Sequence, residues 1–386
     1  MEVMDRRRRS GTDPVSLAPR ARRPGWPRSG LTARQERAFD WLARVVVIAM
    51  GAAWGLSAME AYSPRVLGAP PSAPTPARAV ESSLLDPRAR DTAYLSDQLV
   101  VPLRGQSGKL RAAFRTPGAP LGSAEPPEEA AAHFESEQGR SVVSQEFKAP
   151  TDPGMYKLAV EFGKARQPIE DLRVITLVPF SEKKNERIGL YYLGRWPYES
   201  GGRPRSPAYV NPLGFVEVTP ENRHTLVSEH FALGDFLTKD QFDVWPKYVV
   251  LDPRLPDKLE LTIQELRSEG VRVEHMQIMS GFRTPHYNVS GGNTAGRANL
   301  SRHMFGDAAD VFVDNDRNGT MDDLNGDGRV DTRDSEVIAA AVESVEAQHP
   351  ALAGGVGIYK ACCGHGPFTH IDVRGYRARW RGEGAG

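Results

Sequence analysis

The sequence predicts an α+β fold, in which a small antiparallel sheet with flanking helices follows a small β-rich domain and an N-terminal membrane anchor. Three observations support this prediction. From about residue 226, patterns typical of helices and of strands sharing one small sheet follow each other. Short runs of β-branched and aromatic residues precede them. Near the N-terminus, one uncharged apolar segment follows an arginine-rich leader.

Residues 1–40 form a basic leader, because the first 44 residues contain eleven arginines and no lysine. The uncharged run at 45–59 is marginal for a hydrocarbon core of roughly 30 Å at about 1.5 Å per residue, and apolar flanks extend it to 41–62. Positive charge on one side predicts an uncleaved, single-pass signal anchor in the inner membrane, with the catalytic part in the periplasm or otherwise outside the cytoplasm. A cleaved signal peptide and a buried helix are the alternatives.

Residues 63–150 are rich in Pro, Ala, Gly and Ser and have no sustained apolar period. This composition predicts an extended linker between the anchor and the folded part. From about Gly154, short β-branched and aromatic runs are separated by charged or Pro/Gly turns. Because the connections are short, we expect a small antiparallel β-rich domain at residues 151–222.

Residues 223–386 make up the third predicted unit. A helix is predicted where apolar residues recur between charged ones before Gly270, namely at Leu255, Leu259, Leu261, Ile263 and Leu266. A second helix is expected at 335–348, and strands are expected at 271–281, 307–314, 354–359 and 368–375.

The overall composition narrows the possible functions. The formal net charge is +0, which does not indicate a nucleic acid or another polyanion as partner. The chain has only two cysteines, the adjacent Cys362 and Cys363, so a disulfide framework is excluded. This pair could form a vicinal disulfide, bind a metal, or consist of two ordinary packed residues.

One set of residues has the chemistry of a catalytic metal site. His303 and Asp310 are seven apart, with Gly306 between them to permit a turn, and His370 lies far along the chain. Two imidazoles and a carboxylate leave one tetrahedral position open for water, which is the arrangement of catalytic rather than structural zinc. Taken singly, each histidine is more commonly a structural residue.

Four segments occur in a specific order: SGFRTPHYN at 280–288, SRHMFGDAAD at 301–310, GGVGIY at 354–359 and FTHIDVRGYRARW at 368–380. Together they resemble the motifs of the D-Ala-D-Ala carboxypeptidase and murein endopeptidase metallopeptidases, most closely the murein endopeptidase K type. That family shares its fold with lysostaphin-type peptidases and hedgehog signalling domains. The resemblance covers about residues 226–386, and it implies a zinc peptidase that acts on peptidoglycan stem peptides.

The resemblance also implies roles for single residues. His303, Asp310 and His370 would ligate zinc, and Ser301 would support the first ligand and contribute to substrate binding. Arg283 matches the arginine that faces the substrate, with a binding and a catalytic role. A guanidinium suits a peptide carboxylate or a polarised carbonyl, whereas a salt bridge at a strand end is the alternative for Arg283.

The catalytic base is left open by the sequence. Many members of the wider fold family have a histidine two residues before the last ligand, and this chain has Phe368 there. Asp372 is two residues after His370, on the same strand face, so it could orient that imidazole or act as the general base. Orientation is the favoured role. His365 is the other candidate base.

A second metal signature lies within residues 314–334. Its spacing is that of an EF-hand or dockerin calcium loop, with Gly328 at position 6. The predicted calcium ligands are Asp323, Asn325, Asp327, Arg329 through its carbonyl, Asp331 and Asp334. An upstream set echoes the pattern in part: Asp314, Asp316, Asn318, Gly319 and Asp322. We expect a structural calcium site beside the catalytic strand, with a merely acidic surface loop as the alternative.

These observations lead to one functional prediction and two alternatives. The chain is expected to be a membrane-anchored, extracytoplasmic zinc peptidase acting on peptidoglycan peptides, either as a D,D-carboxypeptidase or as a cross-link endopeptidase. In that reaction zinc and Arg283 would stabilise the oxyanion. The first alternative is a catalytically inactive peptidoglycan-binding or signalling module that retains the zinc fold. The second is a scaffold whose calcium loop docks a partner.

Overall fold

The computed structural model describes residues 111–121, 130–137, 139–162, 164–292, 294, 297–362 and 364–382. All of them belong to the second of the two units into which the chain divides, residues 73–386. The predicted leader at 1–40, the predicted anchor at 41–62 and the predicted linker up to residue 110 lie outside the described residues. Within the described ranges, no helix has both the length and the apolar character that crossing a membrane requires.

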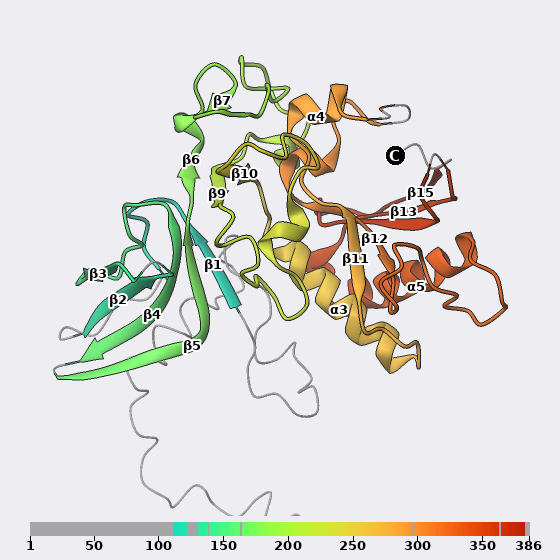
Figure 1. The fold of residues 1–386 in the computed structure, drawn as a ribbon, viewed down its shortest axis with the longest axis horizontal. Helices are drawn as coiled ribbons and strands as arrows, with labels where there is room; N and C mark the ends of the chain where they lie inside the picture. Colours follow the sequence, from blue (N-terminus) through green and yellow to red (C-terminus); the bar gives the residue numbers. More distant parts are fainter. Residues whose placement is uncertain are drawn as a thin grey trace, which may run out of the picture. The chain divides into compact units, whose positions relative to one another are not determined.

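The first sheet has five strands in the order β1-β5-β4-β2-β3 (Figure 1). Its strands are β1 (Arg111–Arg115), β2 (Ala130–Ser136), β3 (Ser141–Ser144), β4 (Gly154–Phe162) and β5 (Ala165–Thr176). The pairs are antiparallel except β1 with β5. The β-rich unit therefore begins by Arg111, inside the range 63–150 that was predicted to be linker.

The predicted linker boundary is wrong because small apolar residues form part of this sheet. Ala113, Ala130 and Ala132 are buried and pack in one cluster with Phe134 and Leu158. Because small alanines rather than large β-branched or aromatic residues fill these strands, the composition of the segment resembled that of a Pro/Ala linker. A composition argument alone could not separate the two.

The predicted boundary at residue 222 is also wrong. Strand β9 (Gly214–Val218) lies between β6 (Val178–Pro179) and β10 (Lys247–Val249) in one sheet, so pairing crosses that position. The other short elements here are β7 (Arg187–Ile188), β8 (Tyr191–Tyr192), η1 (Phe180–Glu182), η2 (Pro207–Tyr209) and η3 (Leu233–Phe236). Trp196 is buried, and its Nε1–H donates to the carbonyl of Met304 at 2.9 Å. Residues from 178 onward thus share the core of the following unit.

A five-stranded sheet carries the candidate site, in the order β11-β12-β14-β13-β15. Its strands are β11 (Met276–Ser280), β12 (Ala308–Val313), β13 (Gly355–Tyr359), β14 (Phe368–Asp372) and β15 (Ala378–Gly382). The first three pairings are antiparallel, as predicted, but β15 is a further strand that pairs parallel to β13. The sheet is therefore mixed, and the whole arrangement is α+β.

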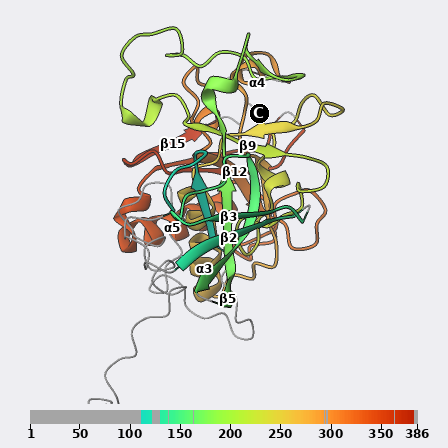
Figure 2. The ribbon, with the colours of Figure 1, turned by 90° about the vertical axis from the view of Figure 1, so that its left-hand side faces the viewer.

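Two long helices cover one face of this sheet. They are α3 (Arg254–Ser268) and α5 (Thr332–Gln348), and they pack against each other. The shorter helices are α4 (Pro285–Ser290), η4 (Arg302–Phe305) and η5 (Pro350–Leu352). In both ribbon views α4 lies on the opposite side of the sheet from α3 and α5 (Figures 1 and 2).

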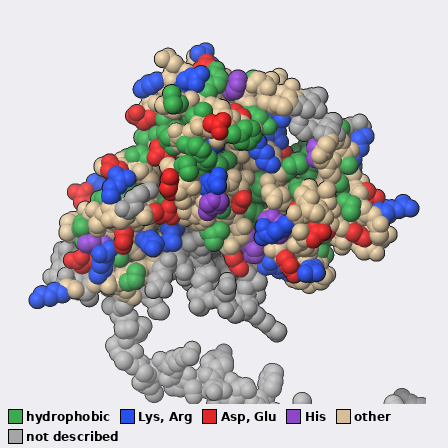
Figure 3. All heavy atoms as spheres, in the orientation of Figure 1, with side chains coloured by type: hydrophobic (Ala, Val, Ile, Leu, Met, Phe, Trp, Pro, Cys, Tyr) green, Lys and Arg blue, Asp and Glu red, His purple; other side chains and the backbone are tan. Residues whose placement is uncertain are grey.

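Both predicted helices are confirmed. In α3, Leu255, Leu259, Ile263 and Leu266 are each 0% exposed, and their spacing of three to four residues places them on one face. The helix ends at Ser268, shortly before Gly270, whose φ of +86° lies in the left-handed region. On the face drawn in Figure 3, cationic and anionic side chains are interspersed, in keeping with the balanced net charge.

Candidate metal centre

The three predicted ligands meet because of the strand register. Asp310 on β12 and His370 on β14 are directly paired residues of adjacent antiparallel strands. His303 comes from η4, the short helix that immediately precedes β12. Gly306 reverses the chain between them with a φ of +70°, and a Cβ at this position would overlap the carbonyl of Val250. The turn that the sequence predicted at Gly306 is therefore present.

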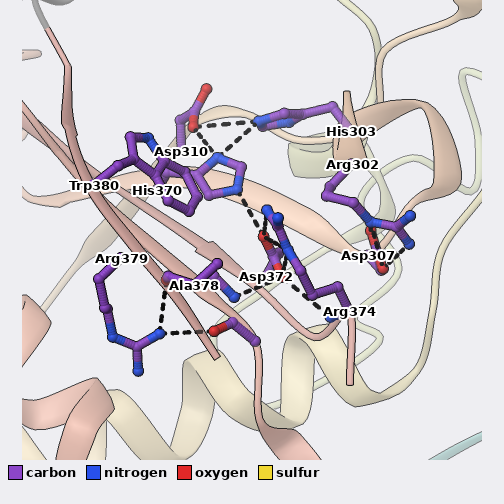
Figure 4. Close-up of polar contacts among 12 residues, drawn as sticks. Arg302, His303, Asp307, Asp310, His370, Asp372, Arg374, Ala378, Arg379 and Trp380 are labelled. Atoms are coloured by element: carbon purple, nitrogen blue, oxygen red, sulfur yellow. Dashed lines mark hydrogen bonds and ion pairs between the residues drawn. The ribbon is translucent and has the colours of Figure 1, made fainter. Parts of the chain in front are cut away.

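The ligand atoms form a compact triangle (Figure 4). His303 Nε2 lies 3.2 Å from His370 Nδ1 and 3.3 Å from Asp310 Oδ1, and His370 Nδ1 lies 2.9 Å from Asp310 Oδ1. An ion held tetrahedrally at about 2.0–2.1 Å separates its ligand atoms by about 3.3 Å, so the triangle has the dimensions of such a site. The residues His303, Asp310 and His370 are only 2%, 3% and 6% exposed.

Hydrogen bonds on the far sides of both imidazoles direct the ligand nitrogens into the triangle. His303 Nδ1–H donates to the carbonyl of Gly281 at 2.7 Å, which leaves Nε2 as a lone-pair donor. His370 Nε2–H donates to Asp372 Oδ2 at 3.1 Å, which leaves Nδ1. The two histidines thus present different nitrogens to the same point.

The electrostatics of the triangle also suit a cation. Burial, and then the charge of Arg283, lowers the pKa of His303 to about 4, so this imidazole is neutral, as a metal ligand must be. Burial raises the pKa of Asp310, but His303 and Arg283 outweigh it and hold the pKa well below 3.8. Burial lowers the pKa of His370, whereas hydrogen bonds to Asp310 and Asp372 more than reverse this. The two carboxylates therefore favour positive charge on His370, which either a proton or a metal ion supplies.

Asp372 lies behind His370 rather than facing the triangle (Figure 4). It is 0% exposed, and its Oδ1 accepts from the backbone N–H of Gly355 at 2.7 Å. Both of its oxygens accept from the guanidinium of Arg374, and the carbonyl of Asp372 accepts from Lys258 Nζ at 2.8 Å. With its acceptor positions used and the imidazole between it and the metal position, Asp372 is placed to orient His370. This geometry does not favour the general-base role.

Gly355 and Gly357 of β13 make this packing possible. A Cβ on Gly355 would overlap the carboxylate of Asp372, and a Cβ on Gly357 would overlap the indole of Trp380. These two positions lie on the strand that pairs with β14 on one side and β15 on the other. Glycine at both positions therefore lets two side chains approach the back and the flank of His370.

Arg283 and Ser301 both lie at the site. Arg283 Nη2 donates to Asp310 Oδ2, the oxygen outside the triangle, at 2.5 Å, and its Nε donates to Ser280 Oγ at 2.8 Å. Ser301 is the residue before η4 and is 8% exposed. Both residues line the cleft next to the three predicted ligands, and Arg283 is also the ion-pair partner of Asp310.

The ligands open into a cleft of about 800 Å³. One wall is aromatic and comes from three strands: Tyr359 stacks on Phe368 with ring centroids 4.6 Å apart, and Trp380 lies 5.1 Å from the His370 ring. Trp380 Nε1–H donates to the hydroxyl oxygen of Tyr359 at 2.7 Å. Because that oxygen accepts from the indole, the phenol proton is left for another acceptor.

No pattern in the sequence predicted roles for Tyr359 and Trp380. Both lie inside quoted segments, Tyr359 at the end of GGVGIY and Trp380 at the end of FTHIDVRGYRARW. The missing signal was the parallel pairing of β13 with β15, which sets Trp380 beside Gly357. A glycine in one strand segment and a tryptophan in another is the pattern that could have indicated this contact.

His365 does not lie among the residues that line the cleft. Its ring is 5.1 Å from that of Phe368, and it lines a separate cavity of about 250 Å³ together with residues such as Phe312 and Met321. Its Nδ1 lies 2.8 Å from the carbonyl oxygen of Gly366. Neither His365 nor Asp372 thus faces the open side of the triangle.

In the predicted calcium loop the side chains mainly hold the backbone. Asp331 and Asp334 form a reciprocal capping box at the start of α5, and Asp334 also accepts from the N–H of Leu324 and Asn325. Asp323 accepts from the N–H of Gly326, Asp327 and Gly328, Asn325 accepts from the N–H of Asp327, and Asp327 accepts from the N–H of Arg329. These contacts hold the loop closed through its own backbone N–H groups.

The acidic side chains that converge most closely precede the predicted loop in the sequence. Ligand atoms of Asp314, Asp316 and Asp322 lie within 4.8 Å of one another. Within the described residues, no such group of three His, Cys, Asp or Glu side chains comes from 323–334. The structure thus brings together the upstream partial set rather than the carboxylates of the predicted loop.

No protein-family model, curated protein or solved structure matches the chain.

Proposed function

We propose that the chain is a zinc-dependent peptidase that cleaves peptidoglycan peptides, with the D-Ala-D-Ala peptidase and hedgehog type of fold in residues 223–386. The observation that carries this proposal is the buried triangle of two imidazole nitrogens and one carboxylate oxygen at the floor of an open cleft. Closed structural zinc sites use four protein ligands, whereas three ligands at a cleft leave a position for water or substrate. The motif resemblance adds the substrate class.

Zinc suits this set better than calcium or magnesium because two of the three ligand atoms are imidazole nitrogens. When bound, zinc would supply Lewis-acid polarisation of the peptide carbonyl and activation of a water molecule. His303, Asp310 and His370 would hold the ion. Asp372 would fix the His370 ring, and Arg283 would keep Asp310 ionised and turned toward the ion.

The remaining polar groups of the cleft would handle the substrate. The Tyr359 hydroxyl, held as an acceptor by Trp380, would donate its proton toward an oxygen that gains charge in the reaction. Burial raises the pKa of Tyr359, so the phenol keeps this proton near neutral pH. Anchoring by residues 41–62 and a location outside the cytoplasm belong to the same proposal, since they rest on the arginine-rich leader.

One observation favours a second candidate, a peptidoglycan-binding module that retains the fold without turnover. Among the described residues that line the cleft, Asp310 is the only Asp or Glu, and Phe368 occupies the position of the histidine found in many related folds. A site with ligands but without a separate base could bind a peptide and leave it intact.

The deciding experiment is a digest of purified muropeptides by the full-length protein, analysed by mass, with and without added zinc. We expect cleavage with zinc, its loss on chelation, and its loss in His303→Ala. His224→Ala serves as the matched control, because His224 is exposed and lies outside the cleft. Bound zinc and retained binding to cell walls without any cleaved product would instead support the binding module.

We further propose that residues 314–334 bind calcium as a structural ion. Hard carboxylate and amide oxygens select calcium over zinc, and Asp323 holds the loop closed by accepting from the N–H groups of Gly326 and Gly328. The measurement is the melting temperature with added calcium, for the protein and for Asp323→Ala. An equal response of both would contradict the site. Calcium-dependent capture of a partner would favour the scaffold role.

A further inference from the structure

The cleft above the triangle carries a marked excess of positive charge. Among the described residues of its lining, Asp310 is the only acidic one, whereas six are arginines. They are Arg205, Arg283, Arg297, Arg302, Arg374 and Arg381. Such an excess of positive charge is balanced either by carboxylates outside the cleft or by an anionic ligand that the cleft binds.

Three of the six arginines are neutralised from outside the cleft. These pairs are Arg302 with Asp307, Arg374 with Asp372, and Arg381 with Glu336. In the first two, both carboxylates are buried and the guanidinium makes more than one hydrogen bond to its partner. These three side chains hold the walls and add no charge that a ligand must balance.

Arg297 differs from them. Its Nη1 donates to the carbonyl of Tyr287 at 2.9 Å, and its guanidinium lies 5.0 Å from the centre of the Tyr287 ring, so the side chain is anchored on α4. Its Nε is buried and has no hydrogen-bond partner. A buried, unsatisfied N–H of a charged group is costly, and it is expected where a ligand completes the contact.

Arg297 also lies in the field of another arginine. Burial, followed by the positive charge of Arg283, lowers its pKa. Arg283 is paired with Asp310, but that carboxylate would be shared with the metal ion. No ion pair of the described residues involves Arg297 or the exposed Arg205. Arg297 and Arg205 therefore bring positive charge into the cleft lining that an anionic ligand would balance.

We propose that Arg297, with Arg283 beside it, binds a free carboxylate of the peptide next to the bond presented to the metal. This rests on the proposed peptidase function and specifies its substrate. A planar guanidinium matches the two oxygens of a carboxylate, which it can bind through two parallel hydrogen bonds. Arg205, at the exposed rim, adds attraction at longer range.

The carboxylate could come from two sources with the same chemistry. It is either the terminal carboxylate of a stem peptide or the free carboxylate of an acidic residue inside a longer peptide. The first source would make the protein a carboxypeptidase, whereas the second is compatible with cleavage of a cross-link.

The test is calorimetric titration of the zinc-loaded, full-length protein with peptides in which a ketomethylene group replaces the amide to be cleaved. These probes keep the carbonyl and cannot be hydrolysed. One ends in a free carboxylate, the second is the same peptide as a C-terminal amide, and the third is that amide with an acidic side chain on its last residue. We expect one of the two acidic probes to bind about 10- to 100-fold more tightly than the neutral amide, the range of a charge-assisted contact.

Arg297→Gln should remove this preference. Arg297→Lys should keep part of it, because lysine retains the charge but not the planar pair of N–H donors of the guanidinium. Arg272→Gln is the matched control, since Arg272 is 76% exposed, pairs with Glu274 and lies outside the cleft lining. Equal binding of all three probes, or an unchanged preference in a folded Arg297→Gln protein, would overturn the proposal. An acid preference without hydrolysis of true peptides would retain the subsite and reject the peptidase function. Hydrolysis without an acid preference would support the peptidase function and reject the carboxylate subsite.

Discussion

Replacing Asp372 with asparagine tests whether the carboxylate behind His370 controls the metal site. Asparagine has nearly the same size, but one of its terminal atoms becomes an NH₂ donor. In the structure both positions face donors: Oδ1 accepts from Gly355 N and Arg374, and Oδ2 accepts from His370 and Arg374. In either orientation the new NH₂ group therefore opposes at least two N–H groups, and the His370 ring loses its charged partner.

The size of the effect follows from those contacts. Loss of an orienting carboxylate lowers metal affinity about 10- to 100-fold, which corresponds to about 1.4–2.7 kcal/mol. The fold is also affected, because buried donors lose their acceptor at about 1–3 kcal/mol. Arg374 can recover part of this by hydration, since its side chain is 15% exposed. We therefore expect a folded Asp372→Asn protein with weakened zinc binding.

The assay is competition for zinc with a chromophoric chelator near neutral pH, alongside thermal denaturation of the zinc-free protein. Asp252→Asn is the matched control, because Asp252 pairs with Arg254 at 2.6 Å in the same local manner but is not part of the ligand network. If the folded Asp372→Asn protein binds zinc within about a factor of three of the wild type, the orienting role is refuted.

Three further predictions address the cleft wall, the strand packing and a distant titrating pair. Tyr359→Phe keeps the ring stack but removes the phenol donor, so kcat on muropeptides should fall about 10²- to 10³-fold with KM and zinc content nearly unchanged; a KM effect alone would contradict the donor role. Gly357→Ala inserts a Cβ against the Trp380 indole and should lower the free energy of unfolding by about 1–3 kcal/mol in urea denaturation, whereas an unchanged midpoint would contradict the close packing. Burial lowers the pKa of His230, but its hydrogen bond to Glu260 at 2.6 Å outweighs this and leaves the pKa above 6.5. The stability that this pair adds is complete below pH 6.5 and is lost as pH rises through the folded-state pKa, so the gap between wild type and His230→Gln should narrow toward alkaline pH; a constant gap would refute it.

The convergence of His303, Asp310 and His370 could be predicted from sequence because residue types that ligate metals are few and their neighbours here carry a pattern. Gly306 between His303 and Asp310 indicated the reversal that brings them together, and the strand patterns around Asp310 and His370 indicated where those two residues lie. The direct pairing of Asp310 with His370 depends on the register of β12 and β14, which the whole core determines. Sequence reasoning reached the residues but not this geometry.

What sequence reasoning missed depends on contacts between distant segments. Arg297 lies in a loop whose position relative to Arg283 follows from packing on α4, so no local pattern distinguishes it from a surface arginine. Trp380 becomes part of the cleft only because β15 pairs parallel to β13 across Gly357. The alanine-rich strand β2 was missed for a local reason instead: its own composition resembled that of a linker.

The proton chemistry of the cleft is where the peptidase and the binding module separate. At position 368 a histidine would stand near the metal, but here a buried phenylalanine stacks on Tyr359, and the polar end of that stack is the Tyr359 hydroxyl. Because burial raises the pKa of Tyr359 and Trp380 occupies its oxygen, this group donates a proton rather than accepting one. If the proposed zinc is bound, such a donor would stabilise developing negative charge, and the metal rather than a separate base would make water reactive. The same donor would add little to binding an uncharged amide oxygen. If Tyr359→Phe keeps its affinity for the peptide but loses turnover, the Tyr359 hydroxyl acts in catalysis. If it loses affinity alone, the hydroxyl acts in substrate recognition.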